Sequence, residues 1–331
     1  MSAAGQGSSH PFDSNTTQED SMKRFLAAVA SAVALAASAA SASALPTRAP
    51  QSERPPIVDI VSTGHEFTMP AEIASGWSTF RYHNRTGGTH FAVIEKLPDG
   101  KTVEDSITEV APVFQDAMDL IHAGDPDAGF AEFANLPAWY PDVVFLGGPG
   151  LLGPHDIGET TVHLEPGTYL IECYVKGLDG TFHTTKGMIE GFVVTDEETG
   201  AEPPRADMAL TLDDNGIHVD GDLKPGRRTV AVHFESQRAY GNLLGHDVHL
   251  ASLDGTDVDA VNDWMNWVTA LTSPTAPTFL GGTHEMPAGH TAYVTVHVTP
   301  GEYAWVAEID DPSSKGFLTT FTVPSTAGSK R

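Results

Sequence analysis

The sequence predicts an all-β protein with two tandem β-sandwich domains, each carrying one helical insertion. Segments that alternate between apolar and polar residues, or run apolar between turn residues, recur along the chain. Its 331 residues include 32 glycines and 23 prolines, which suits a fold with many turns. Short motifs recur in the same order in both halves. A sandwich of two sheets is the economical way to bury such strands.

The predicted strands fall in ten segments bounded by turn residues. They are residues 57–70, 77–84, 90–97, 160–175 and 187–195 in the first half, and 208–219, 228–236, 246–253, 291–309 and 317–323 in the second.

The internal repeat rests on four matched pairs of motifs. They are FLGG at 145–148 and 279–282, PGxY at 166–169 and 300–303, the segments beginning at His90 and His246, and residues 97–105 with 253–259. Four matches in one order indicate two domains of one fold. We therefore expect domains at 57–195 and 208–323, joined by an acidic, proline-bearing linker at 196–207.

Each half contains one segment with helical periodicity, which we expect to pack against the core and not to form a cofactor site. Thr102 with Asp105, and Thr256 with Asp259, stand where each helix would begin, and the first pair predicts a capping box. The apolar stripes consist of Val103, Ile107, Val110, Phe114, Met118 and Ile121 in the first half, and of Val258, Val261, Met265 and Val268 in the second.

The first 44 residues resemble a targeting segment. Met22-Lys23-Arg24 precedes the alanine-rich run 25–40, and Ala42-Ser43-Ala44 supplies a cleavage site. We interpret residues 1–44 as a signal peptide with an upstream extension, because the apolar run is short for a membrane anchor. The predicted location is secreted or periplasmic, with no membrane insertion after cleavage.

Charge and cysteine content restrict the function classes. The formal net charge is -26, and such a surface repels nucleic acid and anionic lipid. One cysteine excludes an intramolecular disulfide. The chain has no serine-hydrolase, P-loop or dinucleotide-binding motif. The sequence specifies neither a redox partner protein nor an oligomeric state.

The lone cysteine belongs to a segment with metal-ligand character. Cys173 is followed by His183 and Met188 on one predicted loop between two strands. One thiolate, two imidazoles and a weak axial thioether make a type 1, or blue, copper site. His90, between a turn-like segment and a predicted strand, is the candidate for the second imidazole. In isolation, each of these residues also fits an ordinary core or loop position.

At these residues the chain resembles the cupredoxins. Residues 65–84 look like their opening strands, Asn84 with His90 like their first ligand region, and 166–188 like their ligand loop. The resemblance implies two Greek-key sandwiches and one type 1 copper bound by His90, Cys173, His183 and Met188. It also implies that Asn84 orients and tunes the site from a second shell.

The long spacing from Cys173 to His183 is similar to that of two-domain copper nitrite reductases. Those enzymes need a second, histidine-rich copper site. Glu172 and Glu95 stand at positions where their histidines would lie, which argues against a catalytic copper.

The second half lacks most of the motif. Ala307 or Glu308 stands in place of the cysteine, Phe317 in place of the methionine, and His246 alone remains. We expect this half to be structural or to bind a partner. A weak second metal site at His246 and His249 stays open. We expect no tight cluster among the other histidines, which are His122, His155, His163, His218, His284, His290 and His297.

The preferred function is an exported copper-binding protein that transfers single electrons. The first alternative is a metal-free exported binding or structural module, and a copper oxidoreductase of the nitrite-reductase type ranks below it. The sequence thus favours an electron carrier or binding protein over a catalyst.

Overall fold

The computed structural model describes residues 54–240, 243–273 and 276–325. The predicted signal peptide lies outside these residues. These described residues form one compact unit. The division of that unit into two domains therefore remains a prediction.

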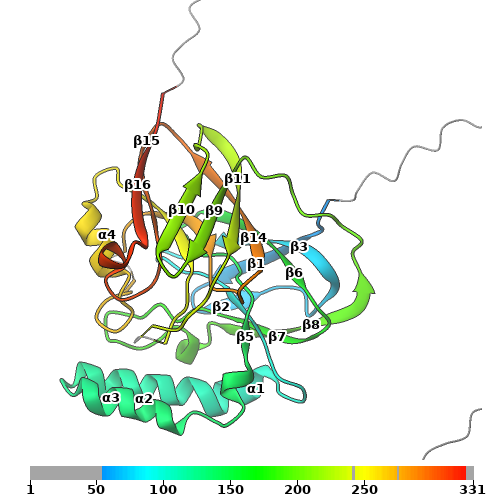
Figure 1. Ribbon diagram of the computed structural model, residues 1–331. Helices are drawn as coiled ribbons and strands as arrows, with labels where there is room; N and C mark the ends of the chain where they lie inside the picture. Colours follow the sequence, from blue (N-terminus) through cyan, green and yellow to red (C-terminus); the bar gives the residue numbers. More distant parts are fainter. Residues whose placement is uncertain (1–53, 241–242, 274–275, 326–331) are drawn as a thin grey trace, which may run out of the picture. The chain divides into compact units, whose positions relative to one another are not determined.

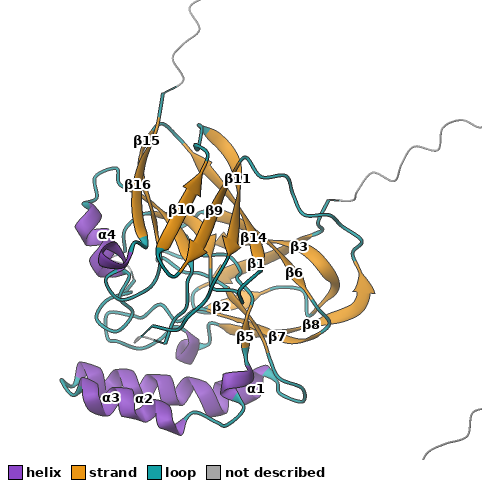
Figure 2. Cartoon of the chain, in the orientation of Figure 1, coloured by secondary structure: helices purple, strands orange, loops and turns teal. Residues whose placement is uncertain are grey.

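The described chain is mostly β-structure, as predicted (Figures 1 and 2). The first half contributes β1 (Ile57–Thr63), β2 (Glu66–Thr68), β3 (Glu72–Asn84), β4 (Val93–Lys96), β5 (Val144–Phe145), β6 (Ile157–Leu164), β7 (Gly167–Glu172) and β8 (Ile189–Glu198). The second half contributes β9 (Met208–Asp213), β10 (Gly216–Asp220), β11 (Gly226–Phe234), β12 (Val248–Ser252), β13 (Phe279–Thr283), β14 (Thr291–Val298), β15 (Gly301–Val306) and β16 (Leu318–Val323). β8 thus runs into the segment predicted as a linker.

Strand pairing follows one pattern in both halves. β3 pairs with β1 in parallel and with β6 antiparallel, and β11 pairs in the same way with β9 and β14. β7 lies between β4 and β8, and β15 lies between β12 and β16. Each half therefore has two groups of strands that can face each other in a sandwich.

In the first half β3 connects the two groups of strands. Its first residues pair in parallel with β8, and from Gly76 onward it pairs with β6. Gly76 has a φ of 96°, and a Cβ there would lie 2.7 Å from the Thr199 hydroxyl oxygen. Glycine permits both the conformation and the close approach at this change of sheet.

One sheet runs through both halves of the described chain. β14 pairs antiparallel with β6, which joins strands of the two halves in a 12-stranded sheet, while β12, β13, β15 and β16 form a separate 4-stranded sheet. Next to this junction the Gly150 N–H donates to the Gly282 carbonyl at 3.0 Å. A Cβ on Gly150 would lie 2.6 Å from the Gly282 carbonyl carbon, so a larger side chain would separate the halves.

The burial pattern distinguishes strands with one covered face from strands covered on both faces. β9 and β14 alternate between buried and more exposed residues, as expected for strands with one face on the core. β12 and β15 are buried along most of their length, which is typical of strands covered on both faces.

The predicted helical insertions are present in both halves. In the first, α1 (Val103–Asp105), a π-helical turn (Ser106–Val110) and α2 (Ala111–His122) run in succession. The Thr102 N–H donates to Asp105 Oδ2 at 2.9 Å in the predicted capping box. α3 (Pro126–Glu132) follows and was not predicted.

In the second half the insertion contains α4 (Val258–Trp264), which lies beside β15 (Figure 1). Its N-cap is Asp257, whose carboxylate accepts from the Asp259 N–H at 3.2 Å, within the stretch from Thr256 to Asp259 where the helix was expected to begin. Among the described residues, the helices are too short or too polar to cross a bilayer.

The PGxY motif makes the same contact in both halves. The Tyr169 hydroxyl donates to the Glu165 carbonyl at 2.6 Å, and the Tyr303 hydroxyl donates to the Thr299 carbonyl at 2.8 Å. Each bond closes the turn that leads into a central strand.

We predict that Tyr169→Phe and Tyr303→Phe each lower the free energy of unfolding by about 1 kcal/mol, because each removes one such hydrogen bond without changing the ring. Urea denaturation followed by circular dichroism measures this. Tyr293→Phe is the matched control, since its hydroxyl makes no hydrogen bond within the described ranges. Equal stability of all three variants would contradict the prediction.

Candidate metal centre

Three side chains from separate places in the first half converge at a buried point. His90 lies between β3 and β4, Cys173 directly follows β7, and His183 precedes a 3₁₀ turn. Cys173 Sγ lies 3.7 Å from His90 Nδ1 and 3.9 Å from His183 Nδ1, and the two Nδ1 atoms are 3.1 Å apart. All three residues are buried, and together they could hold a metal ion. The structure thus brings together three of the four predicted ligands.

The spacing of these three atoms fits a bound metal. A point equidistant from them lies about 2.1 Å from each, by geometry from their separations. Metal bonds to imidazole nitrogen are about 2.0–2.1 Å long and those to thiolate about 2.3 Å. One thiolate and two imidazoles around a common centre are the donor set of a type 1 copper site.

Backbone pairing explains why the long ligand loop keeps His183 beside the sulfur. The Cys173 N–H donates to the Met188 carbonyl at 3.0 Å, and the His183 N–H donates to the Val175 carbonyl at 2.9 Å. The middle of the loop, from Gly177 to Thr181, forms a tight turn in which the Gly177 N–H donates to the Thr181 carbonyl at 2.9 Å. This turn takes up the length of the loop, so Cys173 and His183 stay beside each other.

Met188 is fully buried in the same core cluster as Cys173. Its N–H donates to the His183 carbonyl at 2.9 Å. Its backbone thus holds both Cys173 and His183. The structure therefore shows where the backbone of Met188 lies in the loop. That its thioether is an axial ligand remains a prediction.

Asn84 holds the loop that carries His90. Its side-chain N–H groups donate to the carbonyls of Gly88, Leu152 and Gly153 at 2.8, 3.1 and 2.9 Å, and its carbonyl accepts from the Thr86 hydroxyl at 2.8 Å. The resemblance implies that Asn84 orients the site from a second shell. In the structure it bonds to Thr86 and Gly88 of the His90 loop and to Leu152 and Gly153 of the segment before β6.

The groups that donate toward the sulfur are backbone N–H groups of Phe91 and Val175. Phe91 directly follows the ligand His90, and Val175 lies two residues after the ligand Cys173. Such donors favour the thiolate form. They were missed from the sequence because a backbone N–H leaves no signature in residue type.

His65, on the turn between β1 and β2, is a further residue that the sequence analysis missed. Its ring centroid lies 4.5 Å from that of His183 and 6.3 Å from that of His90. It is partly exposed and covers His183 at the edge of the site.

Burial sets the protonation of the three ligands. It raises the pKa of the Cys173 thiol to about 12. It also lowers the pKa of His90 to about 4 and, with the neighbouring His90, that of His183 to about 2. Without a metal the site therefore holds a neutral thiol and neutral imidazoles. A metal that binds must displace the thiol proton, whereas the imidazoles are already in the ligating form.

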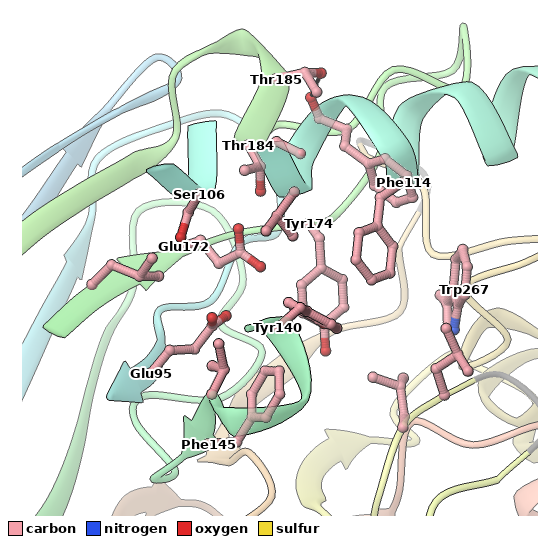
Figure 3. A pocket seen from close by; sticks show the side chains of 17 residues that line it. Glu95, Ser106, Phe114, Tyr140, Phe145, Glu172, Tyr174, Thr184, Thr185 and Trp267 are labelled. Atoms are coloured by element: carbon pink, nitrogen blue, oxygen red, sulfur yellow. Dashed lines mark hydrogen bonds between the residues drawn. The ribbon is translucent and has the colours of Figure 1, made fainter. Parts of the chain in front are cut away.

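A cavity next to the ligand loop contains two buried carboxyl groups (Figure 3). Glu95 of β4 and Glu172 of β7 lie close to each other, and burial raises the pKa of both. Phe114, Tyr140 and Trp267 supply aromatic walls (Figure 3). Positions 95 and 172 are those where nitrite reductases would have copper-binding histidines, and here they carry acids in an apolar cavity.

The second half has no counterpart of the type 1 ligand set at the corresponding positions. The Ala307 N–H donates to the Phe317 carbonyl at 3.0 Å, as Cys173 does to Met188. Ala307, and not Glu308, therefore occupies the cysteine position. His246 packs on the Phe317 ring at 4.7 Å, and its Nδ1 donates to the Ser236 carbonyl at 2.9 Å.

The expectation of no cluster among the other histidines is wrong for His284. It lies with Asp247, His249 and Glu308 in a second buried group whose ligand atoms are within 4.8 Å of one another. Asp247 and His249 stand two residues apart and so share a face of an extended segment. The spacing of Asp247 and His249 was the one signal in the sequence for this group. His284 and Glu308 could not be assigned to it, because they lie far from these two residues along the chain.

Solved structures of blue copper proteins and copper oxidases are similar to this chain. An auracyanin from Roseiflexus castenholzii is 24% identical, with 43% of this chain and 99% of that chain covered and a TM-score of 0.26. Auracyanin A from Chloroflexus aurantiacus is 22% identical, with the same coverages and a TM-score of 0.27. A copper-containing nitrite reductase from Thermus scotoductus SA-01 is 11% identical, with 82% and 62% covered and a TM-score of 0.21.

No protein-family model and no curated protein matches this chain. Because the TM-scores are low, the assignment of fold and site depends on the strand pairings and ligand-atom distances of this chain itself.

We predict that Asn84→Ala lowers the free energy of unfolding by about 3 kcal/mol, because it leaves buried carbonyls without a donor. Chemical denaturation of the metal-free protein measures this. Asn135→Ala is the control: Asn135 is exposed, and its loss should change stability by about 0.5 kcal/mol or less. A similar small effect at both sites would show that Asn84 does not hold the loop.

Lys176 provides a pH test of how the ligand loop is anchored. Its ammonium donates to the Trp267 carbonyl, and burial lowers its pKa from 10.5 to about 8. Between these values the unfolded chain binds more protons, so stability should rise with pH by up to about 1.4 kcal/mol per pH unit. The rise should be reduced in Lys176→Met, as measured by urea denaturation from pH 7.5 to 10.5. Parallel curves for the two proteins would contradict the lowered pKa.

Proposed function

We propose that this chain is an exported copper-binding protein that transfers single electrons through one type 1 copper. The observation that carries the proposal is the convergence of His90 Nδ1, Cys173 Sγ and His183 Nδ1 within 3.1–3.9 Å at a buried point. When bound, copper would supply a centre that cycles between Cu(I) and Cu(II).

The protein's own residues suit such a centre. Asn84 fixes the loop of His90, and the backbone of Met188 fixes Cys173 and His183. Ligands held in this way have little freedom to move when the metal charge changes, which favours fast electron transfer over substrate binding. Burial of the three side chains also excludes water from the ligand positions.

Export is part of the proposal on the basis of the sequence. The predicted signal peptide at residues 1–44 is its support. A redox partner would be a protein, and the chain is proposed to bind no nucleic acid.

The test is addition of Cu(II) to the purified protein, followed by visible absorption and electron paramagnetic resonance. We expect one copper with an intense thiolate-to-copper charge-transfer band that is absent in Cys173→Ser. His183→Gln should also lose the band. Met188→Leu should keep it but change the reduction potential, because an axial ligand tunes the site without forming it.

His297→Gln, a change at an exposed strand position, is the matched control and should behave like the unmodified protein. A folded protein without the band would leave the metal-free binding module as the working function. A band accompanied by nitrite reduction would instead favour the oxidoreductase.

A further inference from the structure

The second buried group consists of two histidines and two acidic residues, which are side chains that a hydrophobic core does not need for its packing. Asp247 directly precedes β12, His249 lies within it, His284 directly follows β13, and Glu308 lies two residues beyond β15. All four are buried, and each offers a ligand atom within 4.8 Å of the others. Burying two carboxyl groups side by side in an apolar core is costly even though Lys176 acts electrostatically on one of them, Glu308.

Hydrogen bonds fix the orientation of His249 and Asp247 within the group. His249 Nδ1 accepts from the Leu151 N–H at 3.1 Å, so its proton is on Nε2, which donates to Asp247 Oδ2 at 2.8 Å. Asp247 Oδ1 accepts from the Glu308 N–H at 2.7 Å. His249 thus orients Asp247, in the way that an outer imidazole orients a metal-binding carboxylate.

His284 is the observation that points to a ligand. It is 2% exposed, and among the described residues its Nε2 is buried without a hydrogen-bond partner. Its ring packs on Phe91 at 4.3 Å between centroids, which fixes its orientation. Burial lowers its pKa far below the usual value, so the imidazole is neutral. A buried, neutral, unpartnered ring nitrogen is in the form that binds a metal.

We propose that Asp247, His284 and Glu308 form a second metal site, which takes a divalent first-row transition ion such as Zn²⁺, with His249 as its positioning residue. Two carboxylates balance the charge of such an ion, and one imidazole with two carboxylates suits borderline ions better than Ca²⁺ or Mg²⁺. The site is distinct from the one around Cys173.

A small cavity borders Asp247 and His284 and is also lined by Gly245 and Glu285. Gly245 and Glu285 also line a wider groove, so the site lies close to a hollow in the protein surface.

The second site lies next to the first, because two residues that directly follow ligands of the first site contact residues of the second. Phe91 follows His90 and packs on His284, while Tyr174 follows Cys173 and its hydroxyl donates to Glu308 at 3.5 Å. A bound ion would therefore strengthen the contact between the halves beside the ligands of the first site.

The test uses the full chain carrying Cys173→Ser and His183→Gln, which removes the first site and makes the result independent of the proposed function. Zn²⁺ is added and binding is followed by calorimetry, with metal analysis after gel filtration. We expect one Zn²⁺ per chain and a higher melting temperature, because the ion binds only the folded state.

In this background His284→Gln and Glu308→Gln should each weaken Zn²⁺ binding by about 100-fold or more, and His249→Gln by about 10–100-fold. His297→Gln, at an exposed position, should leave it unchanged. Circular dichroism of each variant separates loss of the site from loss of the fold.

Two results would overturn the proposal. The first is a folded background protein that binds no Zn²⁺. The second is binding that His284→Gln and Glu308→Gln both leave intact, which would place the ion elsewhere.

Discussion

The antiparallel pairing of β6 with β14 joins strands of the two halves in one sheet, and much of the structure depends on it. Thr160 pairs with Val294 in this register, and the Thr160 hydroxyl donates to the Gly282 carbonyl at 2.9 Å. Close by, Gly150 approaches Gly282 closely enough for a direct backbone hydrogen bond. Residues from the first half are thereby held against β12 and β13 of the second. The buried histidines at 249 and 284 owe their contacts with Leu151 and Phe91 to this junction.

The second constraint is that polar side chains in the core need partners. The first half meets it with a dense set of hydrogen bonds. Asn84 donates to carbonyls of the His90 loop and of the segment before β6, and the ligand loop pairs with itself. These bonds hold His90, Cys173 and His183 in place before any metal arrives. The site can thus be preorganised although its ligands come from two separate segments of the chain, the loop of His90 and the loop of Cys173 and His183.

The sequence was most informative where the signal is local. Cys173, His183 and Met188 lie in one loop between two strands, so their types and spacing alone indicated a metal site. His90 could be found because it stands between a turn and an apolar strand. The strand-rich class followed from alternation, which burial of one sheet face produces directly.

What the sequence did not reveal depends on contacts between distant segments or on the backbone. The N–H groups of Phe91 and Val175 act through main-chain geometry, which no residue type reports. His284 and Glu308 meet only because β13 and β15 both pair with β12. The helix α3 begins with Pro126 and contains Gly129, so its weak intrinsic propensity gave no clear pattern, and packing on α2 stabilises it.

The ligand loop is also anchored by the second half. The Lys176 N–H donates to the Leu271 carbonyl at 3.0 Å, the Ser273 N–H donates to the Lys176 carbonyl at 2.9 Å, and the Lys176 ammonium donates to Trp267. Although the second half has lost the cysteine and methionine positions, its segment from Trp267 to Ser273 still supports a loop of the first. In evolutionary terms, that segment should accept substitutions as sparingly as the ligand loop does, and the two should change together.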